Sequence, residues 1–238
     1  MARQVTWGSA PAHFNDLRAP FDGHTGCQEV ATKLSPLTGF IVMIAADQQR
    51  FRDAVAASKA RASSFIASIP QDLAKREDLI GEEVLRENSS AKSKLGKLYR
   101  LVEELGEAAK PFIACGKGCS ACCRMNVTIS SMEAERLAQF SKKRLVRVDR
   151  HIKHDPTRFA GVACPFLVEN ACSVYEIRPY ACRAHVSFDT TAYWCEPERA
   201  YEEGMGMVSF DGAKSAYLAV LAKVPDSRFA DIRDFFPG

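Results

Sequence analysis

The sequence predicts a mainly α protein, in which an antiparallel helical unit is followed by an irregular, metal-ordered cysteine-cluster segment. Three observations predict this fold class. Apolar residues recur at three- and four-residue steps over residues 47–110, which is typical of helices with one buried face. Four cysteines lie within residues 115–123, and four more follow before residue 196. Residues 155–212 show little periodicity, so we expect bound metal rather than an apolar core to order them.

The helical unit is predicted from three apolar stripes. The first helix begins at about Asp47 and ends at Pro70, and its stripe is Phe51, Val55, Ser58, Ala62, Phe65, Ile66 and Ile69. The second stripe stops at the turn-prone "ENSS" of residues 87–90 and contains Leu73, Ile80, Val84 and Leu85. The third stops at Pro111 and contains Leu95, Leu98, Val102, Leu105 and Ala109. Because short connections favour antiparallel neighbours, these helices should pack together and lead the chain into the cysteines.

Further helices are predicted after the first cysteine cluster. Ser130 precedes Glu133 by three residues, the spacing of a capping box, so a helix should run from about Ser131 to Arg144. The stretches "GAKSAYLAVLAKV" and "DSRFADIRDFF" predict two short closing helices. The expected organisation is therefore an irregular N-terminal arm, a helical scaffold, a cysteine-cluster metal-binding domain and closing helices packed on the same core, over residues 1–46, 47–111, 112–195 and 196–238.

Composition narrows the classes of protein to which the chain can belong. A net charge of +3 and a pI near 8.4 are too mild to indicate a nucleic-acid or membrane-surface partner. The longest apolar run, Phe40 to Ala46, is far shorter than the roughly 20 residues that span a bilayer, and the first residues lack the pattern of a secretory signal. We therefore expect a cytoplasmic protein with no membrane partner. Nine cysteines in a reducing compartment favour metal binding over disulfides.

The cysteine spacing is that of metal ligands. In "CGKGCSACC", Gly116 and Gly118 permit the backbone to fold around one ion. The side chains of the adjacent Cys122 and Cys123 should diverge, so they should serve different metals, or one should be a spectator. Eight cysteines could complete two four-thiolate sites, whereas seven would leave a position open to water, substrate or His185. The candidate ligands are Cys115, Cys119, Cys122, Cys123, Cys164, Cys172, Cys182 and Cys195, while Cys27 reads as a packed thiol.

Three blocks of sequence carry a resemblance to a known family. "CGKGCSACC", "SSMEAERLA" and "CPFLVENACSVYEIRPYACR" resemble the YkgJ-type cysteine-cluster (CxxCxxCC) family over about residues 112–195. The most specific matches lie in the last block, at Cys164, Pro165, Phe166, Leu167, Cys172, Tyr175, Arg178, Pro179, Cys182 and Arg183. Three residues separate Cys115 from Cys119, where the family name has two. The resemblance implies chelation of zinc or iron, and it implies no particular reaction.

Residues beside the cysteines suit a cluster of thiolates. A four-thiolate zinc site carries a formal charge of about −2, which needs cations and hydrogen-bond donors around it. The residues placed for this by sequence are Lys117, Arg124, Arg178, Arg183 and His185. Tyr175 is expected to be a packed ring rather than a catalytic acid.

Several alternatives remain open. The spacing of the first three cysteines is similar to that of radical S-adenosylmethionine enzymes, but residues 124–238 lack the repeated apolar strands of their barrel. Flagellin lysine methylases contain a similar cysteine cluster, so an iron–sulfur-linked protein lysine N-methylase is an alternative. A nucleic-acid-binding zinc module is another, because residues 142–154 are locally basic. Thiolates suit both zinc and an iron–sulfur cluster. The five histidines form no triad pattern, so no catalytic residue is assigned.

Overall fold

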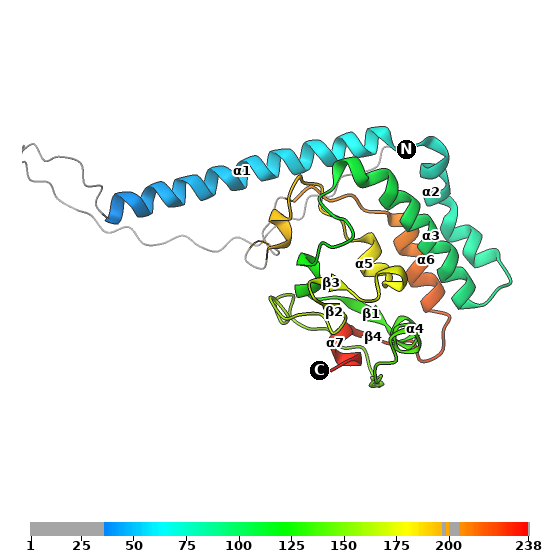
Figure 1. The fold of residues 1–238 in the computed structure, drawn as a ribbon. Coiled ribbons are helices and arrows are strands. Elements are labelled where there is room, and N and C mark those ends of the chain that lie inside the picture. Colours follow the sequence, from blue (N-terminus) through cyan, green and yellow to red (C-terminus); the bar gives the residue numbers. More distant parts are fainter. Residues whose placement is uncertain (1–35, 197–198, 200–204, 238) are drawn as a thin grey trace, which may run out of the picture.

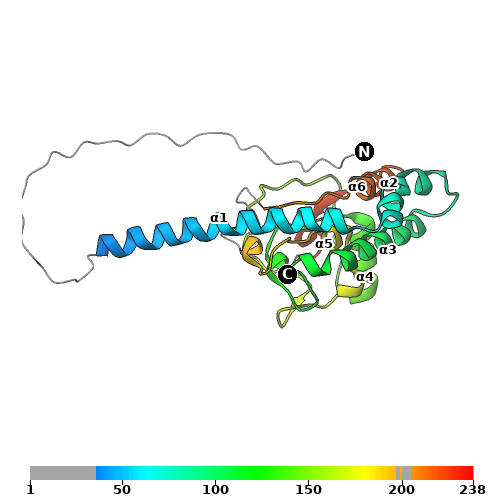
Figure 2. The ribbon, with the colours of Figure 1, turned by 90° about the horizontal axis from the view of Figure 1, so that it is seen from above.

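A long helix lies along one side of a smaller mixed fold. The structure, a computed structural model, describes residues 36–196, 199 and 205–237. Helix α1 (Pro36–Ser68) runs past the other elements, and its N-terminal half projects beyond them (Figures 1 and 2). Helices α2 (Gln71–Arg86) and α3 (Ala91–Ala109) form a hairpin at the other end of α1. A mainly α fold is therefore confirmed.

The predicted ends of the second and third helices are confirmed. Helix α2 stops at Arg86, directly before "ENSS", and the Ser90 side chain accepts a hydrogen bond from the amide of Ser93 to begin α3. Pro111 lies in the short 3-10 helix η1 (Lys110–Phe112) that follows α3. Within the predicted stripes only Leu85 is clearly on the wrong face, since it is 41% exposed.

The start of the first helix differs from the prediction. It begins at Pro36 rather than near Asp47, so residues 36–46 belong to α1 and not to an irregular arm. Proline is well tolerated in the first turn of a helix, where its missing N–H leaves no hydrogen bond unmade. The run "FIVMIAA" is apolar at every position, so it shows no helical period in the sequence. Residues 1–35, including Cys27, lie outside the described residues.

The helical unit gains a partner from the C-terminal part of the chain. Helix α6 (Asp211–Leu221), which the sequence predicts, packs closely against α2 and α3. A Cβ at Gly212 would lie 2.0 Å from the carbonyl oxygen of Glu77, so only glycine permits this approach. Helix α1 instead contacts η1, where Arg61 donates to the Pro111 and Phe112 carbonyls at 2.8 Å each. The packed trio is therefore α2, α3 and α6 rather than the three helices of residues 47–110.

Short elements surround the cysteines. Strand β1 (Thr128–Ser130) pairs antiparallel with β4 (Phe229–Asp231), in the register Ile129 to Ala230. The hairpin of β2 (Leu167–Val168) and β3 (Ala171–Cys172) lies nearby. The helical elements of this part are η2 (Ala121–Arg124), α4 (Ser131–Ser141), η3 (Tyr175–Ile177), α5 (Tyr180–Ala184), η4 (Tyr193–Cys195) and α7 (Ile232–Phe235).

Two predicted helices are shorter than expected. The capping box of Ser130 and Glu133 is confirmed, but α4 ends at Ser141 because Lys142 takes a left-handed conformation with φ 60°. The chain then extends so that Leu145 and Val148 reach an apolar core. The second closing helix is wrong over residues 229–231, where the chain pairs with β1 before the single turn of α7.

The buried apolar residues form two clusters. The first lies mainly among α2, α3 and α6 and includes Phe65 of α1. The second lies around β1, α4, β4 and α7 and includes Phe166. The two closing elements thus pack on different clusters, whereas the sequence suggested one. The domain boundaries themselves stay a prediction. None of the described helices has the length and apolar character needed to cross a membrane.

Candidate metal centre

Eight cysteines line a single cavity of about 400 Å³ between the helical unit and the β1–β4 pair. They come from the loop after η1, from η2, from the segment before β2, and from β3, α5 and η4, and all are free thiols. The lining cysteines are Cys115, Cys119, Cys122, Cys123, Cys164, Cys172, Cys182 and Cys195. The fold therefore brings every candidate ligand named from the sequence to one place, although up to 80 residues separate them. We call this space the cysteine cavity.

The first cysteine loop, residues 113–127, is fixed by bonds to distant backbone. The amide of Ala114 donates to the carbonyl of Ser187 at 3.0 Å, and the amide of Ser187 donates to the Cys115 sulfur at 3.2 Å. Gly118 has a φ of 98°, a left-handed conformation that residues with a Cβ rarely adopt. The expected permissive conformation is therefore found at Gly118, whereas Gly116 does not take a positive φ.

The second cysteine loop, residues 155–166, lies directly against the first. The amide of Cys164 donates to the carbonyl of Cys123 at 2.7 Å, and the amide of Gly161 donates to the carbonyl of Arg124 at 2.9 Å. Asn126 strengthens the contact, because its side chain bonds the carbonyl of Asp155 and the amide of Phe159. Backbone hydrogen bonds thus hold two distant cysteine segments together.

A buried carboxylate positions the helix that carries Cys182. Glu133 is 3% exposed and accepts a hydrogen bond from the amide of Tyr180, the first residue of α5, at 2.8 Å. It also accepts hydrogen bonds from the hydroxyls of Tyr99 at 2.9 Å and Tyr217 at 2.5 Å. Burial raises the pKa of both tyrosines, and the Glu133 charge adds to this, so both remain donors. The capping box identified Glu133, but nothing local to it indicates these other partners.

The electrostatic environment of the thiols separates them into two groups. Burial raises the pKa of Cys195 to about 12, with Cys115 and Cys119 adding to the shift. Burial raises the pKa of Cys164 to about 11, with Cys123 and Cys172 also raising it. Burial likewise raises the pKa of Cys182, which interacts with Cys123, Cys164 and Cys172. These four thiols form one group, and Cys115, Cys119 and Cys195 form the other. Because metals bind thiolates, binding here must displace protons.

The two adjacent cysteines lie between these groups. Cys122 and Cys123 both line the cavity and each shifts the pKa of the other, and the expectation that they serve different metals stays a prediction. Interaction with Cys123 raises the pKa of Cys122, and interaction with Cys122 lowers the pKa of Cys123. Cys122 also interacts with Cys182 and Cys195, one from each group.

Most of the predicted cations lie at the cavity. The Arg183 side chain is 2% exposed, so it is not a surface charge; it pairs with Glu103 and donates to the carbonyls of Arg178 and Glu176 at 2.7 and 2.8 Å. The guanidinium carbon of Arg178 lies 4.1 Å from the ring centroid of Tyr175, which is half-buried. Lys117 also lines the cavity, and Arg124 donates to the Gly161 carbonyl at 3.3 Å.

Two buried nitrogens at the cavity have no hydrogen-bond partner among the described residues: Nε of Arg178 and Nε2 of His185. Burial lowers the pKa of His185, which favours the neutral imidazole. A neutral imidazole nitrogen can accept a proton or bind a metal. His185 therefore adds one nitrogen donor to a wall of sulfurs.

The chemistry of the donor set suits zinc or iron, but the thiols are spread around the cavity. Sulfur from cysteine is the ligand that both zinc and iron–sulfur clusters use in proteins. Within the described residues, no group of three or more His, Cys, Asp or Glu side chains is already close enough to hold an ion. The thiols surround the cavity rather than converging on a point, so binding requires them to move inward.

One functional candidate was missed by sequence reasoning. Arg233 of α7 is 8% exposed and donates to backbone carbonyls in both cysteine loops. It lies about 110 residues after Cys123 in the chain. No local motif marks it, since "DIRDFF" reads only as a short amphipathic turn.

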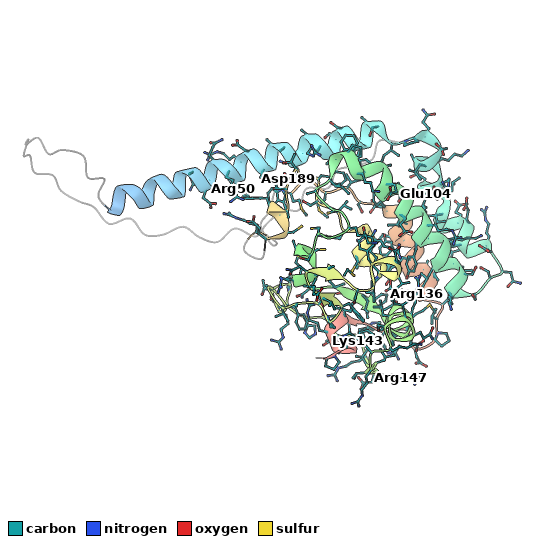
Figure 3. The ribbon with its side chains drawn as sticks, in the orientation of Figure 1. Arg50, Glu104, Arg136, Lys143, Arg147 and Asp189 are labelled. Atoms are coloured by element: carbon teal, nitrogen blue, oxygen red, sulfur yellow. The ribbon has the colours of Figure 1, made fainter. Side chains whose placement is uncertain are left out.

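The basic segment of residues 142–154 lies away from α1. Lys143 and Arg147 are exposed and lie at the end of the molecule opposite α1 (Figure 3). Ile152 and His154 of the same segment face inward, and His154 bonds the Asp234 carboxylate at 2.9 Å. The segment therefore covers the second core and presents its charges to solvent.

Comparison with known proteins yields one match. Residues 114–198 match the CxxCxxCC family, described as a "putative zinc- or iron-chelating domain". The matched segment covers under half of the chain and contains all eight cysteines of the cavity. No curated protein and no solved structure matches the chain.

Proposed function

We propose that this chain is a metal-chelating protein in which the eight cysteines of the cavity supply the ligands for zinc or iron, including the option of an iron–sulfur cluster. The observation that carries the proposal is that cysteines from six separate segments line one cavity. Eight thiols gathered without forming a disulfide have metal binding as their most direct use. When bound, the metal would order the loops that connect these segments.

The grouping of the thiols supports two sites rather than one. Cys123, Cys164, Cys172 and Cys182 interact with one another and would form the first four-thiolate set. Cys115, Cys119 and Cys195 interact in the same way. Cys122, which interacts with Cys123 and Cys182 of the first set as well as with Cys195, is left to complete the second set. His185 is the alternative fourth ligand there, because it lines the same cavity and its Nε2 has no hydrogen-bond partner among the described residues.

Anaerobic purification followed by metal analysis and visible absorption tests the proposal. We expect one to two zinc ions per chain in a colourless sample, or iron with a broad absorption near about 400 nm that bleaches on reduction. Less than one zinc or iron per chain would remove the proposal. Iron with this absorption would also favour the protein lysine N-methylase alternative over the nucleic-acid-binding zinc module, because only the methylase alternative involves an iron–sulfur cluster.

Single Cys→Ser variants test which thiols are ligands. Cys119→Ser, Cys122→Ser, Cys164→Ser, Cys172→Ser and Cys182→Ser should each lower the metal content and loosen residues 155–195. Cys27→Ser is the matched control, with full metal content and a stability change of about 1 kcal/mol or less. Equal metal loss in Cys27→Ser would assign a ligand to the N-terminal arm, and no loss in any of the five would place the site elsewhere.

A further inference from the structure

The guanidinium of Arg233 uses all of its hydrogen-bond donors. An arginine side chain has five N–H groups in a fixed plane. In Arg233, Nε donates to the carbonyl of Ala163 at 3.3 Å, and Nη1 donates to the carbonyl of Met125 at 3.2 Å and to the Asp231 carboxylate at 2.9 Å. Nη2 donates to the carbonyls of Val162 at 2.5 Å and Cys123 at 3.3 Å.

The four carbonyl acceptors of Arg233 belong to the two cysteine loops in equal number. Cys123 and Met125 lie in the first loop, and Val162 and Ala163 lie in the second, directly before Cys164. Each of these carbonyls would otherwise point into a partly buried region, where an unpaired acceptor is costly. One side chain thus supplies hydrogen-bond donors to carbonyls of both loops and fixes the distance between the loops.

Arg233 is itself held rigidly. Asp231 is 2% exposed and accepts from Nη1, while its other oxygen accepts from the amide of Val127 at 2.6 Å. The Phe159 ring lies 4.9 Å from the guanidinium carbon and covers it. The side chain therefore cannot leave its position without breaking its ion pair with Asp231 and its hydrogen bonds to both loops.

We propose that Arg233 is a positioning residue of the metal centre, whose guanidinium ties the two cysteine loops together so that Cys123 and Cys164 can approach one metal ion. This inference rests on the proposed function for the metal, whereas the tie between the loops stands on the hydrogen bonds alone. Arg233 lies outside the segment that matches the chelating family. Its positive charge also acts on both thiols, and would offset part of the negative charge of a thiolate site.

The geometry requires arginine rather than any cation. Lysine would supply a point charge with three donors on a flexible stem, and it could not reach acceptors on both loops from one plane. Arg233→Lys therefore separates the charge from the planar fork, and Arg233→Met removes both. Arg228→Met is the matched control, because Arg228 is a partly buried arginine that bonds the carbonyls of Asp149 and Ser227, outside both cysteine loops.

The experiment compares these full-length variants with the parent protein in two measurements. Cobalt(II) titration follows the thiolate-to-cobalt absorption, which reports the coordination itself and which a purely structural residue would not change. Amide hydrogen exchange of the metal-stripped protein follows peptides from residues 119–127 and 156–166. We expect Arg233→Met and Arg233→Lys to weaken cobalt binding by about 10–100-fold, to remove part of the thiolate absorption per chain, and to speed exchange in both loops.

Each result decides the inference. The inference is wrong if Arg233→Lys behaves like the parent protein in both measurements. It is also wrong if Arg233→Met changes neither measurement. Arg228→Met that weakens cobalt binding as much would also overturn it, since the effect would not be specific to the loops. If Arg233→Met does not fold, Arg233→Lys carries the test. If the parent binds no cobalt, the proposed function fails, and hydrogen exchange still decides whether Arg233 joins the loops.

Discussion

The two halves of this molecule are held together by different forces. In the helical half, α2, α3 and α6 bury large apolar side chains such as Leu98 and Leu105, which are fully buried. In the cysteine half, a second apolar cluster lies beside the loops, and the loops themselves are organised by carboxylate and guanidinium side chains bonded to backbone, above all those of Glu133, Arg183 and Arg233. Apolar burial is non-directional, whereas these polar contacts fix specific chain segments at specific distances.

The two halves should therefore respond differently to amino-acid substitutions. A helical core tolerates shifts of neighbouring side chains, because burial matters more than the identity of each contact. A loop whose order depends on a few buried polar side chains, and on the metal that we propose, should respond to their loss as a unit.

The largest effect should follow metal removal, and it should be confined to the cysteine half. Treating the metal-loaded protein with a chelator should expose residues 155–195 to protease and hydrogen exchange, because metal binding is coupled to loop order. Peptides from α2, α3 and α6 should keep their protection. Equal loosening of both halves would show that they form one cooperative unit.

Truncating the helical core should give the next largest effect. Phe65 is fully buried and packs against Phe188 with ring centroids 5.3 Å apart. Phe65→Ala should lower the free energy of unfolding by about 3–5 kcal/mol, through lost burial and the cavity that remains. Leu85→Ala serves as the control and should change it by less than about 1 kcal/mol, since that side chain is exposed. Chemical denaturation measures both.

Crowding the α2–α6 contact should come third. Gly212→Ala places a Cβ against the Glu77 carbonyl and forces the two helices apart, at a cost of about 3 kcal/mol. Gly81→Ala is the control in the same helix pair, because a Cβ at Gly81 meets nothing within 4 Å. Higher helix propensity should stabilise that variant by up to about 1 kcal/mol. Thermal unfolding measures both variants. Equal shifts of their midpoint temperatures would contradict the close contact between Gly212 and the Glu77 carbonyl.

The smallest effect should come from changing the carboxylate that joins the halves. Tyr180 and Ser130 donate their amides to different oxygens of Glu133, and an amide side chain has only one acceptor oxygen. Glu133→Gln should therefore cost about 2 kcal/mol by leaving one buried donor unpaired. Glu135→Gln, on the exposed face of the same helix, should have almost no effect. If hydrogen exchange in α5 is unchanged in Glu133→Gln, then Glu133 does not hold the start of α5 in place.

Sequence patterns predicted the first half well and the second half only in part. Periodicity located α2, α3 and α6, and the capping box located α4, because these signals act within one or two turns of the chain. The cysteine spacing also identified the thiols that line the cavity. Periodicity missed the start of α1, where every residue is apolar, and the β1–β4 pairing, whose partners are about a hundred residues apart. Arg233 was missed for the same reason, since its acceptors carry no side-chain signal.

The pairing of β1 with β4 has a consequence for how the protein is made. The cysteines of the first loop leave the ribosome well before the chain reaches Phe229–Asp231 and the arginine that follows. At about 5–20 residues per second, the 110 residues between Cys123 and Arg233 take roughly 5–20 s to synthesise. During that interval the nascent thiols lack the contacts that bring them together, and they are open to oxidants and to any metal in reach. If the proposed roles of the thiols and of Arg233 hold, metal loading waits for the last segment to be synthesised, or depends on a factor that shields the thiols until then.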